Sequence, residues 1–156
     1  MSVSGKTFDE LKVGDRFVFT SITLTEAHIV LFAGISGDFN PLHLSEEFAR
    51  RGIFGGRVAH GMLTASIMSG AVGTLLAGTA MALLDVAFRF VAPVRIGDTI
   101  QTEAEVLEKR PSRKYRGGVV KLGVVCRNQR GERVVEGSMT ILVSNERAFK
   151  PKQRET

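Results

Sequence analysis

The sequence predicts a single α+β domain in which an antiparallel β-sheet wraps around one long apolar helix. Two observations carry this prediction. Residues 58–84 carry no formal charge, and within them a helical apolar pattern extends from about 61 to 77. From residue 86 onward the apolar residues alternate with a period of two, which is typical of half-buried antiparallel strands. We expect residues 1–156 to form one domain, with an ordered core over about 8–145 and a flexible basic tail over 146–156.

The segment before the central helix supplies a strand and two short helices. "RFVFTSIT" (16–23) has the composition of a strand. "TLTE" (23–26) matches a capping box and predicts a helix that continues toward Ser36. Ser45 is followed by two glutamates, so it predicts the start of a second, short helix.

The uncharged run over 58–84 is 27 residues long, which is enough to span a bilayer. It contains His60 and four glycines, however, and Gly78 is placed to end a helix. We therefore divide the run into a helix and the beginning of a strand, and expect no membrane segment. This helix is apolar nearly all round, which predicts that it is buried. Small side chains recur at every fourth position and would let a backbone or a flat ligand come close: Ala65, Ser69, Gly73 and Ala77.

Four strands are expected after the central helix, each recognised by alternating apolar residues. The turns between them include "RIGD" (95–98) and "NQRGE" (128–132). An exposed edge of such a sheet would favour pairing with a second copy of the chain. The predicted inward-facing sets are Val86, Phe88 and Phe90; Ile100, Thr102, Ala104 and Val106; Val120, Leu122, Val124 and Cys126; and Val135, Met139, Ile141 and Val143.

Composition is that of an ordinary soluble globular protein, with 44% apolar and 24% charged residues. One cysteine, Cys126, excludes an internal disulfide and a cysteine metal cluster. The N-terminal residues show no basic stretch followed by an apolar run, so we expect the protein to be cytoplasmic.

The net charge of +5 comes mainly from two basic segments, 108–116 and 149–155. Such clusters are either solvated surface or a site for a phosphate-bearing ligand. Single-stranded nucleic acid would require aromatic residues between the charges, and only Tyr115 is present, so no nucleic-acid partner is expected.

"GDFNPLH" (37–43) places an acid, an amide and an imidazole within seven positions. Pro41 keeps Asn40 out of the helical region, which predicts a tight loop. In a loop, Asp38 and His43 can converge on one small volume with Asn40 beside them.

This stretch is very similar to the signature of the MaoC-like hydratases, the (R)-specific enoyl-CoA hydratases. The resemblance continues through "VAHGMLTASIMSG" (58–70) and "RFVAPVRIGDTI" (89–100), and covers roughly residues 10–145. It implies a hotdog fold, a homodimer or larger homo-oligomer, and reversible hydration of trans-2-enoyl-CoA to an (R)-3-hydroxyacyl product. Coenzyme A is then part of the substrate, and no separate cofactor or metal is expected.

By the same resemblance Asp38 and His43 would be the catalytic pair, with either one as the acid. Asn40 would help to seat the water, and the Gly61 amide would bind the thioester oxygen, since free amides and the positive dipole lie at a helix start. His60 and His28 are expected to be structural, and the three histidines lack metal-ligand spacing.

Further candidates concern the substrate. Ser69 and Val72 lie two to three turns from Gly61 and would contact the acyl tail, while Asp85 departs from the small or neutral residues of many relatives. Arg113 and Arg116 would bind the phosphates of coenzyme A, although an acidic acyl carrier protein could use the same basic loop. Two other functions remain open: a hotdog thioesterase and a non-catalytic subunit that binds acyl-CoA.

Overall fold

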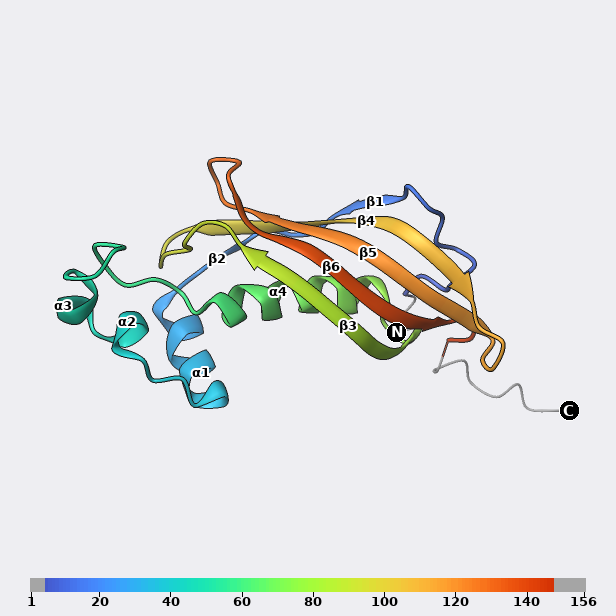
Figure 1. The fold of residues 1–156 in the computed structure, drawn as a ribbon, viewed down its shortest axis with the longest axis horizontal. Helices are drawn as coiled ribbons and strands as arrows, with labels where there is room; N and C mark the ends of the chain where they lie inside the picture. Colours follow the sequence, from blue (N-terminus) through green and yellow to red (C-terminus); the bar gives the residue numbers. More distant parts are fainter. Residues whose placement is uncertain (1–4, 148–156) are drawn as a thin grey trace, which may run out of the picture.

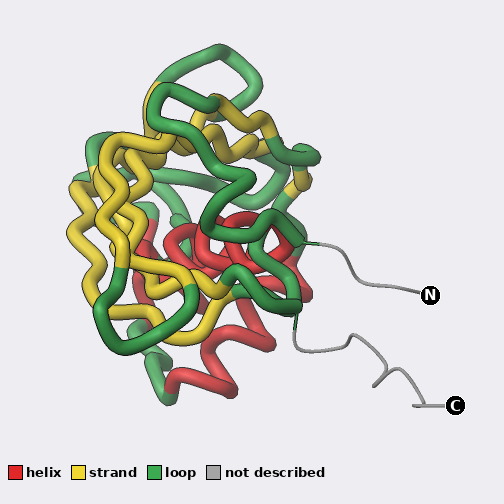
Figure 2. The backbone as a smooth tube through the Cα atoms, turned by 90° about the vertical axis from the view of Figure 1, so that its right-hand side faces the viewer, coloured by secondary structure: helices red, strands yellow, loops and turns green. Residues whose placement is uncertain are grey.

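The computed structural model describes residues 5–147, in which a six-stranded antiparallel sheet curls partly around helix α4 (Figures 1 and 2). The strand order is β1-β4-β5-β6-β3, and β2 also pairs with β4. The strands are β1 (Arg16–Val18), β2 (Ile22–Thr23), β3 (Ala80–Phe90), β4 (Thr99–Pro111), β5 (Gly117–Arg127) and β6 (Arg133–Ser144). The helices are α1 (Glu26–Ser36), α2 (Pro41–Leu44), α3 (Glu46–Ala49) and α4 (Gly61–Leu75). This arrangement confirms the predicted α+β architecture.

Strands β4, β5 and β6 follow the predicted alternation. Their inward-facing side chains are buried against α4 and form most of the core. The pairing is in register along nearly the whole length of β5, from Gly117 opposite Ser144 to Cys126 opposite Val135. Because apolar side chains occupy one face only, the pattern of the sequence fixes which face of these three strands meets the helix.

The prediction that β3 is half-buried is wrong for this chain. Phe88 packs against the core, whereas every other residue of β3 is exposed. Within residues 5–147, β3 pairs with β6 alone and is an edge strand. Alternation identified the strand correctly, but burial depends on what covers it, and within residues 5–147 most of β3 has no covering element.

Helix α4 is also less buried than its composition predicts. Leu63, Met68 and Val72 are buried, but Met62 is 60% exposed, and Gly70 and Gly73 face open space. The sheet covers one side of the helix, so the opposite side stays uncovered in a single copy. The uncharged run divides as expected into α4 and the start of β3, and no helix among the described residues is long and apolar enough to span a membrane.

Residues 16–23 form two short strands instead of the single strand predicted. Val18 lies opposite Glu103 and Ile22 lies opposite Ile100, so four steps along this segment match three steps along β4. The extra residue makes a bulge. The side chain of Gln101 donates a hydrogen bond to the Phe19 carbonyl at 2.9 Å and satisfies one backbone group there.

The capping box of α1 lies two residues later than predicted. Thr23 belongs to β2, and the N-cap of α1 is Thr25, whose backbone N–H donates to His28 Nδ1 at 3.0 Å. His28 therefore takes the position that a glutamate usually fills in this motif. This contact also assigns His28 a local structural role, as expected. The short helix after Ser45 is present as α3, with the Ser45 hydroxyl accepting a bond from Phe48 N at 3.3 Å.

The first and last described segments are joined by Glu10. Its carboxylate accepts a hydrogen bond from Thr7 N at 2.8 Å and two from Arg147, at 2.8 and 2.7 Å. Of the tail predicted over 146–156, residues 148–156 lie outside the described part. Glu146 and Arg147 are held by ion pairs with Arg116 and Glu10.

These contacts predict a dependence of stability on pH. The backbone hydrogen bond from Thr7 and then the Arg147 guanidinium lower the pKa of Glu10 from 4.5 to about 2. A carboxyl with a lowered folded-state pKa stabilises the fold above its unfolded pKa, and this contribution is lost as the pH falls toward the folded value. Urea unfolding of wild type and Glu10→Gln should therefore show a stability difference at pH 6 that shrinks between pH 4.5 and 2. A difference that stays constant over this range would contradict the assignment.

Candidate active site

The segment 37–43 brings Asp38 and His43 together. Gly37 ends α1 in the left-handed conformation, with φ of 74°, and turns the chain toward Asp38. Asn40 is extended, as predicted, but Pro41 then begins the one-turn helix α2, which carries His43. Proline suits the first position of a helix because its missing N–H would have no partner there. The predicted loop is thus a turn followed by a helical turn.

Asp38 Oδ2 and His43 Nε2 are 3.9 Å apart. This distance is too long for a direct hydrogen bond, but one water molecule can contact both atoms. The His43 side chain is 10% exposed and that of Asp38 is 49% exposed. A buried imidazole therefore faces a carboxylate that solvent can reach.

The tautomer of neutral His43 follows from its other ring nitrogen. His43 Nδ1 lies 2.8 Å from the carbonyl oxygen of Val58, which can only accept a hydrogen bond. Nδ1 therefore carries the hydrogen, and Nε2 presents its lone pair toward Asp38. The geometry gives the pair one proton acceptor on the imidazole and a carboxylate beside it.

Asn40 contributes to the local structure of this turn. Its side-chain oxygen accepts a hydrogen bond from Leu42 N at 3.0 Å and caps α2. Its backbone N–H donates to Asp38 Oδ1 at 3.2 Å. The exposed Asn40 therefore fixes both the carboxylate and the helix that carries His43.

Gly61 begins α4 on one wall of a cavity of about 320 Å³ that His43 also lines. As the first residue of the helix, Gly61 has an amide without an acceptor inside the helix. A Cβ at this position would lie 3.2 Å from the Phe90 ring, so the close approach of β3 favours glycine here. The cavity is lined mainly by apolar side chains, among them Leu42, Phe54, Val58, Phe90 and Val94.

Arg57 links three segments around the site, and the sequence analysis did not identify it. Its Nε donates to the His43 carbonyl at 2.7 Å, and its two terminal nitrogens bind Glu26 at 3.0 and 2.7 Å. The hydrogen bonds from Arg57 lower the pKa of Glu26. Arg57 is the last charge before the uncharged run, which is the signal that could have marked it.

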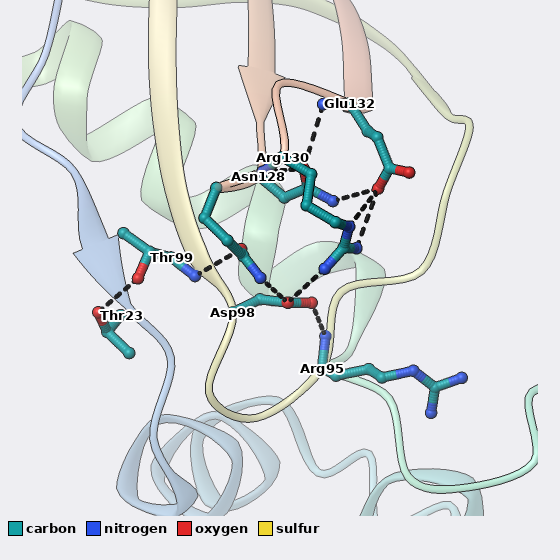
Figure 3. Close-up of polar contacts among 8 residues, drawn as sticks. Thr23, Arg95, Asp98, Thr99, Asn128, Arg130 and Glu132 are labelled. Atoms are coloured by element: carbon teal, nitrogen blue, oxygen red, sulfur yellow. Dashed lines mark hydrogen bonds and ion pairs between the residues drawn. The ribbon is translucent and has the colours of Figure 1, made fainter.

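A polar network centred on Asp98 follows Val94, which lines the cavity, by a few residues along the chain (Figure 3). Asp98 accepts hydrogen bonds from Arg95 N at 2.8 Å and Gln129 Nε2 at 2.7 Å, and Arg130 lies 3.6 Å away. These bonds tie the predicted turns at 95–98 and 128–132 to each other. The adjacent Val94 carbonyl accepts a bond from Ala59 N at 2.7 Å, which joins this segment to the approach of α4.

The remaining predicted substrate residues lie away from this cavity. Ser69 and Val72 line a second cavity of about 270 Å³, between α4 and the first residues of β3. Asp85 pairs with Thr140 and so faces away from the core side, where Met139 and Ile141 point. Of the two effects that the sequence allowed for Asp85, on the acyl pocket or on a subunit contact, its place on the exposed edge strand β3 agrees with the second.

Arg113 and Arg116 are exposed on the loop between β4 and β5. This loop lies at the end of the sheet where α4 ends, opposite α2 and α3 (Figure 1). The 15 residues of α4 span about 22 Å, so the loop and His43 are separated by roughly the length of that helix. Arg116 also forms an ion pair with Glu146 at 2.8 Å.

His60 lies next to the pair. The potential metal-ligating atoms of three side chains are within 4.8 Å of one another: Asp38, His43 and His60. Sequence spacing gave no sign of this cluster. The two imidazole rings are stacked, with centroids 3.8 Å apart and planes at 27°. One ion cannot lie close to the planes of two rings stacked in this way, which is poor geometry for two imidazole ligands. The arrangement is better suited to proton transfer.

The fold and this site define a hotdog protein with a carboxylate and an imidazole at the start of its central helix. Structural comparison agrees: a Mycobacterium tuberculosis protein with a double hotdog fold matches with a TM-score of 0.83 at 22% identity, over 97% of this chain and 48% of that one.

The chain belongs to the MaoC-like domain family, whose signature matches residues 10–127. It is 37% identical over 136 residues to an (R)-specific enoyl-CoA hydratase of Rhodospirillum rubrum, covering 87% of this chain and 90% of that protein. The unliganded R-hydratase structure from Pseudomonas aeruginosa matches with a TM-score of 0.79 and 37% identity, over 90% of this chain and 86% of that one. The resemblance noted from residues 37–43 is confirmed.

Proposed function

We propose that the protein reversibly hydrates trans-2-enoyl-CoA to (R)-3-hydroxyacyl-CoA. The observation that carries this proposal is the 3.9 Å separation of Asp38 Oδ2 and His43 Nε2, beside a cavity that His43 and Gly61 both line. The names of the two hydratase relatives support the same reaction class.

The reaction needs three functions, and the site offers a group for each. A water between Asp38 and His43 loses a proton to one of them as its oxygen bonds to C3. The other member of the pair delivers a proton to C2 on the same face, which gives syn addition. The negative charge that develops on the thioester oxygen is stabilised by the Gly61 amide and the positive end of α4. Dehydration follows the same steps in reverse.

Crotonyl-CoA tests this proposal directly. Loss of the enoyl absorbance without release of free thiol, with (R)-3-hydroxybutyryl-CoA as the product, is the expected result. Release of free coenzyme A would instead identify a thioesterase. Neither change with crotonyl-CoA or with longer enoyl-CoA substrates would favour a subunit that only binds acyl-CoA. The thioesterase is disfavoured because hydrolysis needs no proton delivery to C2. A series of longer enoyl-CoA substrates would then define the acyl length.

We further propose that the protein acts as a homodimer or larger homo-oligomer. The edge strand β3 exposes Met81, Leu83, Leu84 and Val86, each between 43% and 54% exposed. An unpaired strand with apolar side chains is a template for pairing with another strand. Light scattering after size exclusion should give at least twice the 17.0 kDa mass of the chain. A monomer at micromolar concentration would refute this part of the proposal.

The basic loop between β4 and β5 also gives a prediction. Coenzyme A carries phosphates that lie outside the acyl site, and the arginines of this loop could bind them. If two copies pair through β3 in antiparallel fashion, the Ala80 end of one strand lies beside the Phe90 end of the other, and the loop approaches the partner's site. Neutralising Arg113 and Arg116 to Gln should raise KM at low salt with little change in kcat, and the effect should shrink as salt screens the charges.

The matched control for this loop variant is Arg16→Gln with Arg133→Gln, which removes the same charge from exposed arginines elsewhere on the sheet. An equal rise in KM in the control would assign the effect to net charge. An unchanged KM in the loop variant would show that the loop does not bind the phosphates and is a solvated connection between strands.

A further inference from the structure

His60 contacts both members of the proposed catalytic pair. Its Nε2 lies 3.0 Å from the backbone carbonyl oxygen of Asp38, and its ring stacks on His43. The side chain is 2% exposed, and Phe32 packs on it with ring centroids 5.1 Å apart. As the N-cap of α4, His60 also provides the carbonyl that accepts Leu63 N at 3.0 Å. One residue thus connects the start of α4 with both segments that carry the pair.

The hydrogen bonds of His60 are incomplete. Because a carbonyl only accepts, Nε2 carries the hydrogen that bonds to Asp38, and Nδ1 is the bare nitrogen. Nδ1 is buried and has no hydrogen-bond partner among the described residues. A buried polar atom without a partner costs free energy, and an apolar side chain would avoid that cost. The imidazole therefore needs an explanation beyond filling space.

We propose that His60 is a positioning residue that orients Asp38 and His43 for proton transfer, an inference that rests on the proposed hydratase function. The bond to the Asp38 carbonyl fixes the turn from which the carboxylate extends. The stack restricts the tilt of the His43 ring, while the Val58 carbonyl fixes its rotation. Together these contacts hold Asp38 Oδ2 and His43 Nε2 at the separation that one water can bridge.

Two substitutions separate the two contacts. His60→Gln retains an N–H that can reach the Asp38 carbonyl but removes the ring, and His60→Phe retains a ring for stacking but removes the donor. His60→Ala removes both. Misplacement of reacting groups by about 1 Å can cost 10²-fold in rate, so we expect kcat of His60→Ala to fall about 10- to 100-fold. The Gln and Phe variants should lie between His60→Ala and wild type.

The division between kcat and KM distinguishes positioning from the alternatives. His60 is buried behind His43, so KM for crotonyl-CoA should stay within about 3-fold of wild type. His28→Gln is the matched control, because His28 lies in α1 and its side chain bonds only to Thr25 among residues 5–147. Thermal unfolding of each variant establishes that the measured protein is folded. If His60→Ala does not fold, the Gln and Phe variants carry the test.

A second readout does not depend on activity. In wild type the Nδ1–H of His43 should give one sharp ¹⁵N-coupled resonance, and in His60→Ala this resonance should broaden or exchange faster with solvent. Folded variants with kcat within 2-fold of wild type and an unchanged His43 resonance would overturn the positioning role. So would a rise in KM at constant kcat, which would place His60 in substrate binding. A wild-type protein that leaves every enoyl-CoA of the length series intact would refute the hydratase function, and the resonance alone would then decide the positioning role.

Discussion

Asp38→Asn and His43→Ala should each leave a folded protein whose hydratase kcat is lower by about 10²-fold or more, since removing a positioned acid or base costs on that order. Asp38→Asn keeps the size of the side chain and its bond from Asn40 N, so it removes only the group that titrates. His43→Ala removes the imidazole that faces the carboxylate at 3.9 Å. Steady-state kinetics with crotonyl-CoA measure both effects.

Asp9→Asn is the matched control for the acid, because Asp9 is exposed and lies outside the strand β3 through which two copies are proposed to pair. Its kcat should match that of wild type. Asn40→Ala should have a smaller effect than either catalytic change, since it removes the cap of α2 but leaves both proton-transfer groups in place. Near-normal turnover in a folded Asp38 or His43 variant would refute the assignment of the pair.

Gly137→Ala should produce a large loss of stability, because the site of the new Cβ is already occupied by backbone. Gly137 lies opposite Phe88 in the β3–β6 pair, and a Cβ there would lie 1.9 Å from the backbone oxygen of Ala87. Backbone cannot move aside without breaking the pair, so we expect a loss of about 3 kcal/mol or more in the free energy of unfolding, at the upper end for overpacking. Urea unfolding at neutral pH measures this loss.

Gly34→Ala is the control, and we expect it to preserve or raise the free energy of unfolding. Gly34 lies within α1, and nothing stands within 4 Å of the position that its Cβ would take. Alanine in a helix interior is favoured over glycine by up to about 1 kcal/mol. Equal unfolding midpoints for Gly137→Ala and wild type would show that β3 does not pack on β6 in this register.

The sequence predicted best those strands whose buried face packs against another part of the same chain. In β4, β5 and β6 one face meets α4 and the other meets solvent, so alternation alone identifies the face. The same reasoning failed for β3 and for the outer side of α4, because their apolar residues have no covering element among residues 5–147. Composition reports that a surface is apolar, but it cannot report what lies against it.

At the site, local chemistry predicted that Asp38 and His43 approach each other, since Pro41 prevents a continuous helix through the segment. Three further features depend on residues distant in sequence and could not be predicted: the bond from Arg57 to the His43 carbonyl, the His43–His60 stack, and the separation of Ser69 and Val72 from the His43 cavity. Tertiary packing decides these contacts, and no local pattern encodes them.

The cavity beside His43 has two walls of different origin. One wall comes from residues 42–64, the stretch that also carries His43, Gly61 and the contacts that orient them. The other comes from the sheet side, Phe90–Val94 and Val135, which provides no titrating group. Substitutions in the second wall can therefore change the shape of the cavity without altering the residues proposed to transfer protons. If the proposed hydratase function holds, substitutions at residues 91–93 should change acyl preference and leave the proton-transfer groups in place.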